Sequence, residues 1–294
     1  MIKHLITRIE MQMPKFSKGQ VKIARFIEQN YAEAAYMTAA RLGDTVGVSE
    51  STVVRFAMEL GYSGYPQLQR AMQEIIRDKL TSVQRIDVTA ERIGTDHVLD
   101  SVLNQDIERI RRTLEETSHT DFEQAVEAIV KAKKIYIFAV RSAASIANFL
   151  GYYLELCFGN VRVINATGTV EIYEHLFRLS GDDVLIGISF PRYSSMSVRA
   201  MEFARERGAH TVAITDSLVS PLVPAADSVL LARSDMASIV DSLVAPMSLI
   251  NALIVATVVR KKDDVKATFS TLEEVWNNQD VYTKLDAQAA ENTQ

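Results

Sequence analysis

The alternation of short apolar runs with helical segments in the second half of the chain constrains the fold most strongly. Five short apolar runs predict buried strands, at 135–140, 161–164, 184–189, 211–215 and 229–231. The segments 143–157, 170–179 and 196–207 between them have the periodicity of helices. Strands that alternate with helices form βαβ units, which build a parallel sheet with helices on both faces. The sequence therefore predicts an α/β three-layer domain with a parallel sheet.

Two loops of this predicted sheet carry polar and cationic side chains. Arg141 and Ser142 follow the first predicted strand, and the segment after the third contains Ser189, Arg192, Ser194 and Ser195. Ligands of such sheets bind beyond the carboxyl ends of the strands. Hydroxyls, arginines and helix N-termini together provide the chemistry that holds a phosphate or a carboxylate. The alternative is that these residues are ordinary helix caps and solvated loop arginines.

The N-terminal part contains a pair of short helices in the stretch 37–66. Thr38 is expected to cap the first helix, and Gly47 supplies the turn that ends it. Ser49 is expected to cap the second helix, with its hydroxyl accepting from the backbone N–H of Ser51 or Thr52. A capping box at 17–20 opens an earlier helix, so residues 1–80 are predicted to form an all-α N-terminal domain.

The second helix of the pair has two distinct faces. An apolar stripe is formed by Val53, Phe56, Ala57 and Leu60. The opposite face carries Ser51 and Arg55, which are the kinds of side chain that reach phosphate oxygens and guanine edges in a DNA major groove. The alternative is an ordinary αα-hairpin, which is common in helical domains.

The run Val46-Gly47-Val48-Ser49-Glu50-Ser51-Thr52-Val53-Val54-Arg55-Phe56, followed by Leu60-Gly61-Tyr62, resembles the helix-turn-helix of RpiR-type bacterial transcriptional regulators. The resemblance implies that operator DNA is a partner and that it is bound by Ser49, Ser51, Thr52, Arg55 and Tyr62. One departure is Gly43, where the family usually has alanine. We expect this glycine to cost up to about 1 kcal/mol of helix propensity without touching a DNA-contact residue.

The second half resembles a sugar isomerase (SIS) domain, the phosphosugar-binding fold of the same regulators, in 135–150, the Ser189 loop, 213–217 and 220–222. The family's first loop is usually Gly-x-Gly-x-Ser, whereas this chain has Ala139-Val140-Arg141-Ser142-Ala143. The second is usually Ser-x-Ser-Gly-x-Thr, whereas this chain has Pro191 and Arg192 between Ser189 and Ser194. Without these glycines the backbone cannot approach an anion closely, but Arg141 and Arg192 can replace that contact with charge-assisted hydrogen bonds. A ligand other than the usual phosphosugar is therefore an open alternative.

Charge and cysteine content limit the partners and the compartment. The net charge is −5, but residues 1–80 carry 11 of the 32 basic and 8 of the 37 acidic residues, a net of +3 against −8 for the rest. A basic module attached to an acidic one is typical of a protein whose N-terminal part meets phosphates. The single cysteine, Cys157, excludes an internal disulfide and a cysteine metal cluster, so we expect a cytoplasmic protein without metal or cofactor.

The chain is expected to have four parts: a helix-turn-helix domain at 1–80, a linker and connecting helix at 81–119, the SIS-like domain at 120–262, and a C-terminal helix and tail at 263–294. Residues 81–96 show no sustained periodicity of apolar residues, which indicates the linker. The connecting helix, 98–116, is expected to bury Val102, Ile107, Ile110 and Leu114. A second capping box at 120–123 is expected to open a helix that reaches Ala132.

The segment 238–259 is apolar around nearly its whole circumference. It includes Asp241, Pro246 and Asn251, which favour a buried helix over a membrane span. One face of a sheet cannot cover the whole apolar surface of such a helix. We therefore expect a homo-oligomer, a dimer or tetramer assembled mainly through the C-terminal half. The alternative is a helix buried entirely within one subunit.

Three functions fit these features. The first is a DNA-binding transcriptional regulator, not an enzyme, whose SIS domain senses a small anionic metabolite such as a sugar phosphate. The second is a phosphosugar isomerase, for which His175 or Glu174 are the nearby general-base candidates, although His175 also suits a partly buried helix position. The third is a SIS domain that serves only for oligomerisation.

Overall fold

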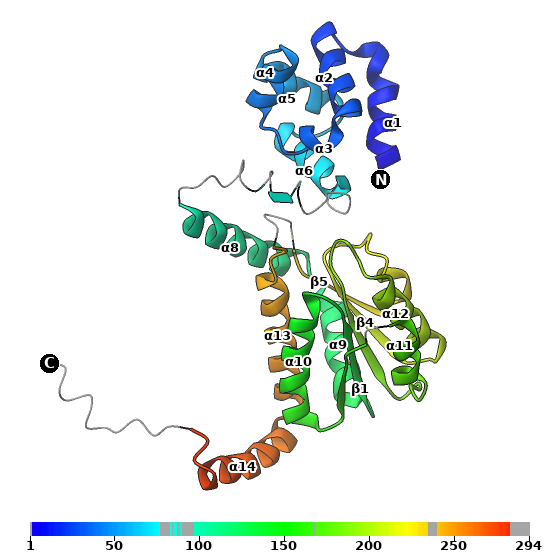
Figure 1. Ribbon diagram of the computed structural model, residues 1–294, viewed down its shortest axis with the longest axis vertical. Helices are drawn as coiled ribbons and strands as arrows, with labels where there is room; N and C mark the ends of the chain where they lie inside the picture. The colour runs from blue at the N-terminus through cyan, green and yellow to red at the C-terminus, as the bar shows by residue number, and fades with distance from the viewer. Residues whose placement is uncertain are drawn as a thin grey trace, which may run out of the picture. The chain divides into compact units, whose positions relative to one another are not determined.

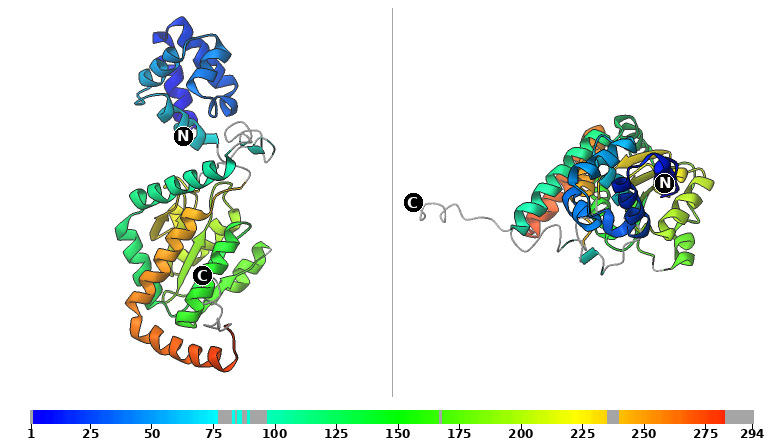
Figure 2. Two further views of the ribbon diagram at one scale, coloured as in Figure 1. Left: turned by 90° about the vertical axis from the view of Figure 1, so that its left-hand side faces the viewer. Right: turned by 90° about the horizontal axis from the view of Figure 1, so that it is seen from above.

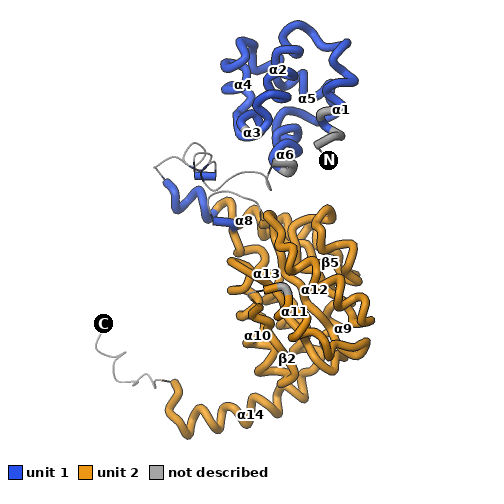
Figure 3. Tube along the Cα trace, turned by 45° about the vertical axis from the view of Figure 1, so that its right-hand side comes forward, with its two compact units in different colours: residues 1–103, 236–241 blue, residues 104–235, 242–294 orange. Residues whose placement is uncertain are grey.

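A computed structural model of the chain describes residues 2–76, 97–166, 168–234 and 240–282, together with Val83, Arg85, Ile86 and Thr89. The chain divides into two compact units, which are coloured separately in Figure 3. The first comprises residues 1–103 and 236–241, and the second comprises 104–235 and 242–294. Most of the predicted linker at 81–96 lies outside the described residues.

The N-terminal part of the first unit is entirely helical in its described residues (Figure 1). Its elements are α1 (Ile2–Gln12), η1 (Met13–Lys15), α2 (Lys18–Gln29), α3 (Tyr31–Ala34), α4 (Ala39–Val46), α5 (Glu50–Glu59) and α6 (Tyr65–Ile76). The predicted capping box of α2 is confirmed. The Ser17 N–H donates to Gln20 Oε1 at 2.8 Å, and the Gln20 N–H donates to Ser17 Oγ at 3.4 Å.

The second unit is built on a five-stranded, all-parallel sheet with the strand order β2-β1-β3-β4-β5. The strands are β1 (Ile135–Ala139), β2 (Val161–Ile164), β3 (Val184–Ile188), β4 (His210–Thr215) and β5 (Ser228–Leu231). Every predicted strand is present, with its ends within one residue of the prediction. The predicted α/β fold with a parallel sheet is therefore confirmed.

Helices cover both faces of this sheet. On one face lie α9 (His119–Lys131), α10 (Ala143–Phe158) and α13 (Val244–Arg260), and on the other lie α11 (Thr169–Leu176) and α12 (Ser195–Glu206). Side chains of β1 alternate between the two cores, because Ile135 and Ile137 join the α10 side while Tyr136 and Phe138 join the α12 side. All four are buried, as expected of a strand covered twice.

Two predicted helix starts are corrected. The N-cap of α9 is Ser118, whose Oγ accepts from the Asp121 N–H at 3.2 Å, and Thr120 lies in the first turn. The two hydroxyl residues lie two positions apart, and the chain uses the earlier one. The helix predicted from residue 238 begins at Val244; residues 235–239 lie outside the described ones.

The burial predicted for the connecting helix is wrong. This helix, α8 (Val98–Glu116), has the predicted ends, but its four predicted core positions are exposed: Val102 by 37%, Ile107 by 54%, Ile110 by 38% and Leu114 by 71%. Its buried residues are Arg109 and Thr113. The Thr113 hydroxyl accepts from the Arg233 N–H at 2.8 Å, and the Asp106 carboxylate accepts from the Ser242 hydroxyl at 2.7 Å, so polar contacts hold α8 on its own domain. The apolar stripe consequently faces outward.

The C-terminal helices differ in how far their own chain covers them. In α13 Leu249, Ile250, Leu253 and Ile254 are buried, while Val255 and Val259 are exposed. After a bend of 99° follows α14 (Lys262–Asn278), in which Val265 is the buried residue. Among the described residues, no single helix is long and apolar enough to cross a membrane. The bent pair of α13 and α14 passes that test by length and composition when taken together.

Candidate functional site

The helix pair α4–α5 has the turn that the sequence predicts. Thr38 caps α4, since its Oγ1 accepts from the Arg41 N–H at 3.2 Å. Gly47 ends α4 in the left-handed conformation, with φ of 71°. Only glycine adopts this conformation without steric cost, and it turns the chain directly into the second helix. Behind the turn, Val53, Phe56, Ala57 and Leu60 of the predicted stripe are all buried.

The start of α5 differs in one detail from the prediction. Ser49 occupies the N-cap position but makes no side-chain bond to the helix backbone. Its Oγ instead lies 2.9 Å from Ser51 Oγ and 2.9 Å from Thr52 Oγ1. Neighbouring hydroxyls thus satisfy one another. Because the Thr52 N–H donates to the Ser49 carbonyl at 2.9 Å, the N–H groups of Glu50 and Ser51 are the ones at the start of α5 that solvent or a bound phosphate can reach.

The exposed side of α5 presents Ser51 and Arg55 together. Glu50, Ser51, Val54 and Arg55 line a shallow depression on the surface. Arg55 is exposed, and its Nε donates to the Ser51 carbonyl at 3.3 Å, which holds the guanidinium along the helix. A guanidinium placed on the face opposite the core stripe has the geometry to enter a DNA groove.

Tyr62 has different surroundings from Ser51 and Arg55. Its half-buried ring packs against the core of the helical unit and lies under the Arg8 guanidinium, 4.9 Å from the ring centroid. Arg8 comes from α1, and sequence reasoning did not single it out. A cation beside the end of α5 complements the negative end of the helix dipole.

Gly43 proves to lie against the turn that leads to α5. A Cβ added there would lie 2.7 Å from the Val48 carbonyl oxygen and 3.4 Å from the backbone of Ser49. The Val48 N–H also donates to the Gly43 carbonyl at 2.8 Å. A side chain at position 43 would therefore press on the turn that carries Ser49, a predicted phosphate contact, which gives glycine a physical reason at this position.

In the second unit, the predicted anion loops lie at the point where the strand order reverses. The chain runs from β1 outward to β2 and then returns to β3 on the other side of β1. The loops after β1 and β3 therefore leave the same edge of the sheet from adjacent strands. Parallel sheets of this strand order bind their ligands at this switch point.

The serines of the β3 loop hold the loop and the helix after it. Ser189 is buried, and its Oγ accepts from the Ser194 N–H at 3.1 Å. Ser194 is the N-cap of α12, and its Oγ accepts from the N–H groups of Met196 and Ser197. Both hydroxyls act as acceptors in these bonds, so each retains a proton to donate to a bound anion. Ser195 is exposed at the first helical position.

Arg141 and Arg192 share an unusual backbone conformation. Their φ angles are +59° and +63°, in the left-handed region that favours glycine. Both stand where the typical SIS loop patterns have glycine, so the chain keeps the glycine-like conformation with an arginine side chain in place. Such a residue costs roughly 1–2 kcal/mol of strain, which is characteristically concentrated at ligand-binding loops. Ser142, next to Arg141, is the exposed N-cap of α10.

A network of hydroxyls below these loops was missed by sequence reasoning. Thr215, at the end of β4, donates to the Ser189 carbonyl at 2.8 Å and lies 2.8 Å from Ser220 Oγ. Tyr193 donates its hydroxyl to the buried Asp216 carboxylate at 2.7 Å. The β3 and β4 loops are therefore fixed to each other. The sequence signal was the cluster of hydroxyl and acidic residues directly after the β4 strand.

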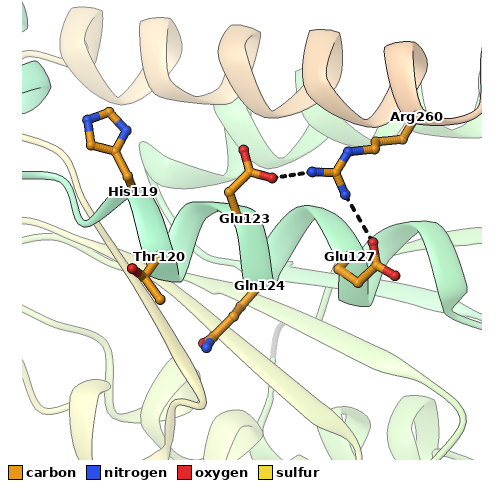
Figure 4. Close-up of a pocket in the computed structure, with 6 residues that line it drawn as sticks. All are labelled: His119, Thr120, Glu123, Gln124, Glu127 and Arg260. Atoms are coloured by element: carbon orange, nitrogen blue, oxygen red, sulfur yellow. Dashed lines mark hydrogen bonds and ion pairs between the residues drawn. The ribbon is translucent and has the colours of Figure 1, made fainter.

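Other grooves on the second unit offer a poorer anion site. Figure 4 shows one between α9 and α13, in which Arg260 faces two carboxylates. Arg260 forms ion pairs with Glu123 and with Glu127, the latter at 3.0 Å. Its positive charge is thus already neutralised. Within the described residues, no group of three or more His, Cys, Asp and Glu side chains is arranged to hold a metal ion.

His175, the general-base candidate, lies far from the switch point in the fold. It is in the last turn of α11, which runs back toward the start of β3, and its Nδ1 lies 2.6 Å from the Arg162 guanidinium. Arg162 is the second residue of β2. The imidazole therefore sits toward the amino ends of the strands, whereas the candidate loops leave the carboxyl ends.

Comparisons with known proteins identify both the helical domain and the parallel-sheet domain. Residues 3–79 match the helix-turn-helix domain of the rpiR family, and residues 128–256 match the SIS domain. An uncharacterised HTH-type transcriptional regulator of Caldanaerobacter subterraneus is 25% identical over 269 residues, which cover 88% of this chain and 92% of the relative.

Two solved structures are similar as well. The sugar isomerase domain of an RpiR transcription factor from Sphaerobacter thermophilus is 31% identical, with a TM-score of 0.58, over 61% of this chain and 99% of that one. The NanR protein of Vibrio vulnificus, in complex with ManNAc-6P, is 20% identical, with a TM-score of 0.56, over 94% and 98% of the two chains. The helical unit that contains α4 and α5 and the unit built on the parallel sheet are thus the two domains of one kind of regulator. The chain belongs to the rpiR family of helix-turn-helix regulators that carry a SIS domain.

Proposed function

We propose that this regulator binds operator DNA through the exposed face of α5 and that its SIS domain senses a small anionic metabolite, a sugar phosphate or related carbohydrate derivative, which controls operator binding. In this proposal the protein acts in the cytoplasm as a homo-oligomer, a dimer or tetramer, without a cofactor and without catalysing a reaction. Ser51 and Arg55 read the groove, while Ser49 and Thr52 hold phosphates. Tyr62, which packs beside Arg8, supports the end of α5.

The observation that carries the sensing part is the pair of left-handed arginines at the switch point. Arg141 and Arg192 lie in the loops after adjacent strands, beside Ser142, Ser189, Ser194 and Ser195. A phosphate or carboxylate at this edge would receive charge-assisted bonds from the guanidinium groups and neutral bonds from the hydroxyls. The ligand of Vibrio vulnificus NanR, ManNAc-6P, makes a hexosamine phosphate a reasonable first compound to test.

Two measurements test the sensing. Thermal unfolding of the full chain is followed with hexose phosphates, hexosamine phosphates including ManNAc-6P, sugar acids, and the same sugars without a charged group. A ligand at a hundred times its dissociation constant adds about 2.7 kcal/mol to the free energy of unfolding. Binding of the full chain to DNA selected from a random duplex library is then measured with and without each hit. A panel in which no anion changes either quantity favours a SIS domain that only oligomerises.

A charge variant at Ser194 tests the site with its fold preserved. Alanine at Ser194 would remove the cap of α12 as well as the hydroxyl, at about 1 kcal/mol, whereas aspartate is an equally good N-cap. Ser194→Asp should therefore keep the helix and repel an anion. The matched control is Ser118→Asp, because Ser118 caps α9, a helix that packs on β5. Loss of the ligand response in both variants, or in neither, would place the anion elsewhere.

The isomerase alternative is tested by turnover of fructose 6-phosphate or arabinose 5-phosphate. We expect none, since the His175 Nδ1 bonds to Arg162 toward the opposite end of the strands from the candidate loops. Measurable isomerisation that His175→Gln abolishes would replace the sensor with an enzyme.

A further inference from the structure

Helix α2 carries three basic side chains in a row on its outer side. Lys18, Lys22 and Arg25 follow one another at i, i+4 and i+7, which places them on one side of a helix, and we call them the basic row. All three are exposed, whereas the apolar residues of the opposite side are buried. Residues 11–27 contain no acidic residue. In the described part of the chain, no ion pair includes a member of the basic row.

The start of α2 lies against the start of α5 within the helical unit, which Figure 2 shows in blue and cyan from two further sides. A Cβ added at Gly19 would lie 3.3 Å from Val48 Cγ1 and 3.4 Å from Thr52 Cγ2. The ring of Phe16, just before α2, packs on the ring of Phe56 of α5, with 5.0 Å between the ring centroids. Because Thr52 is a proposed phosphate contact, the basic row begins beside the proposed DNA-binding surface.

The basic row opposes what the isolated helix would favour. The N-terminal end of a helix carries a partial positive charge, so an acidic side chain in the first turn stabilises the helix and a basic one destabilises it. Helix α2 has no acidic residue in its first turn, and Lys18 is its first residue. Residues that act against local stability are expected at functional positions. A phosphate bound beside this turn would remove the conflict, because it neutralises the lysine charges and is attracted to the helix N-terminus.

We propose that the basic row is a second phosphate-binding surface of the DNA-binding unit and that it contacts the DNA backbone beside the groove that α5 enters. The row spans about 10 Å at a rise of about 1.5 Å per residue. One strand of B-DNA carries a phosphate about every 3.4 Å along the helix axis, so the row matches about three phosphates. Contacts to phosphate oxygens raise the affinity for DNA without reading the base sequence. The inference rests on the proposed function in that α5 binds operator DNA.

The test is the salt dependence of DNA binding by the full chain. Each phosphate contact contributes about 0.9 to the slope of log K against log salt concentration. Lys18→Gln with Lys22→Gln and Arg25→Gln should reduce that slope by about 2 to 3 and weaken binding at least about 10-fold at 100 mM salt. The affinities for the selected operator and for an unrelated duplex of the same length should fall by the same factor. The charge-preserving control, Lys18→Arg with Lys22→Arg and Arg25→Lys, should keep the wild-type slope.

A second control separates the basic row from the net charge of the protein. Lys133→Gln with Lys134→Gln and Lys262→Gln removes three positive charges from exposed positions of the second unit and should leave the slope unchanged. Thermal melting separates DNA contact from a structural role. The melting temperature of the basic-row variant should equal or exceed that of wild type, because the conflict with the helix dipole is relieved while DNA binding weakens.

Four results would overturn the inference. The first is an unchanged slope in the basic-row variant, which would point to an acidic protein surface as the occupant. The second is an equal change of slope in the second-unit control. The third is a lower melting temperature together with weaker binding, and the fourth is a loss of affinity for the operator alone. Binding to the unrelated duplex needs no operator. A protein that selects no operator therefore contradicts the proposed function, while a reduced slope on the unrelated duplex still supports the basic row.

Discussion

The left-handed backbone of Arg192 predicts a stability change with an unusual sign. Its φ is +63°, a conformation that costs a residue with a Cβ roughly 1–2 kcal/mol and costs glycine nothing steric. Arg192→Gly and Arg192→Ala both remove the guanidinium, so their difference isolates the backbone. The greater freedom of glycine in the unfolded chain offsets about 0.4–1 kcal/mol of the gain. We therefore expect the glycine variant to be more stable than the alanine variant by about 0.5–1 kcal/mol.

Urea unfolding followed by Trp276 fluorescence measures this difference, because Trp276 and Arg192 lie in the same compact unit. The control pair is Arg111→Gly and Arg111→Ala, at an exposed position within α8, where glycine should be the less stable by about 1 kcal/mol. If Arg192→Gly is also less stable than Arg192→Ala, the strain argument is refuted. Both Arg192 variants should lose the ligand response equally, since neither carries the guanidinium. The two variants would then differ in stability but not in sensing.

Three further changes test the helical unit. Helix propensity predicts that Gly43→Ala stabilises the helix by about 1 kcal/mol, but the new Cβ would lie 2.7 Å from the Val48 carbonyl oxygen, and overpacking costs about 1–3 kcal/mol. We therefore expect a lower melting temperature, measured by circular dichroism, and weaker DNA binding. Arg55→Ala should weaken operator binding by about 1–3 kcal/mol with unchanged melting, whereas Arg70→Ala on α6 should have a smaller effect; equal affinities for wild type and Arg55→Ala would contradict the assigned face. Burial raises the pKa of the Tyr65 phenol, whose hydroxyl donates to the Met37 carbonyl at 2.9 Å. The unfolded chain then releases this proton first as pH rises above about 10, so the free energy of unfolding falls there. Tyr65→Phe should lower the free energy of unfolding by about 1 kcal/mol at neutral pH, and its difference from wild type should shrink between pH 9 and 11.

The sheet was predictable because its strands are buried on both faces. A strand such as β3, with all five residues buried, appears in the sequence as an uninterrupted apolar run between polar loops. The strand order follows less directly, since the alternation of strands and helices does not say on which side of β1 the chain returns. The switch point between β1 and β3 therefore came from the structure, although the residues of its two loops were already identified.

Local hydrogen bonds and backbone angles were predicted less well, because a serine or threonine hydroxyl can form its hydrogen bonds with several alternative partners. Ser17 and Gln20 form the expected box, since few other hydroxyls compete there. Ser49 bonds to two neighbouring hydroxyls instead of the backbone. The positive φ angles of Arg141 and Arg192 leave no trace in composition. They become visible only when the loop patterns are compared with the glycine-containing form and the backbone is known.

Helix α8 shows a more general limit of periodicity. The stripe of Ile107, Ile110 and Leu114 was found correctly, and its period is that of one helix face. A stripe indicates that something must cover it, but the cover can come from the same chain or from another. In α8 the hydrogen bonds to the rest of the domain are made by Asp106 and Thr113, polar residue types that are usually exposed. A helix attached through its polar side, with its apolar side outward, is the arrangement expected of an element shared between two copies. The failure of the burial prediction is thus itself an argument for the homo-oligomer of the proposed function.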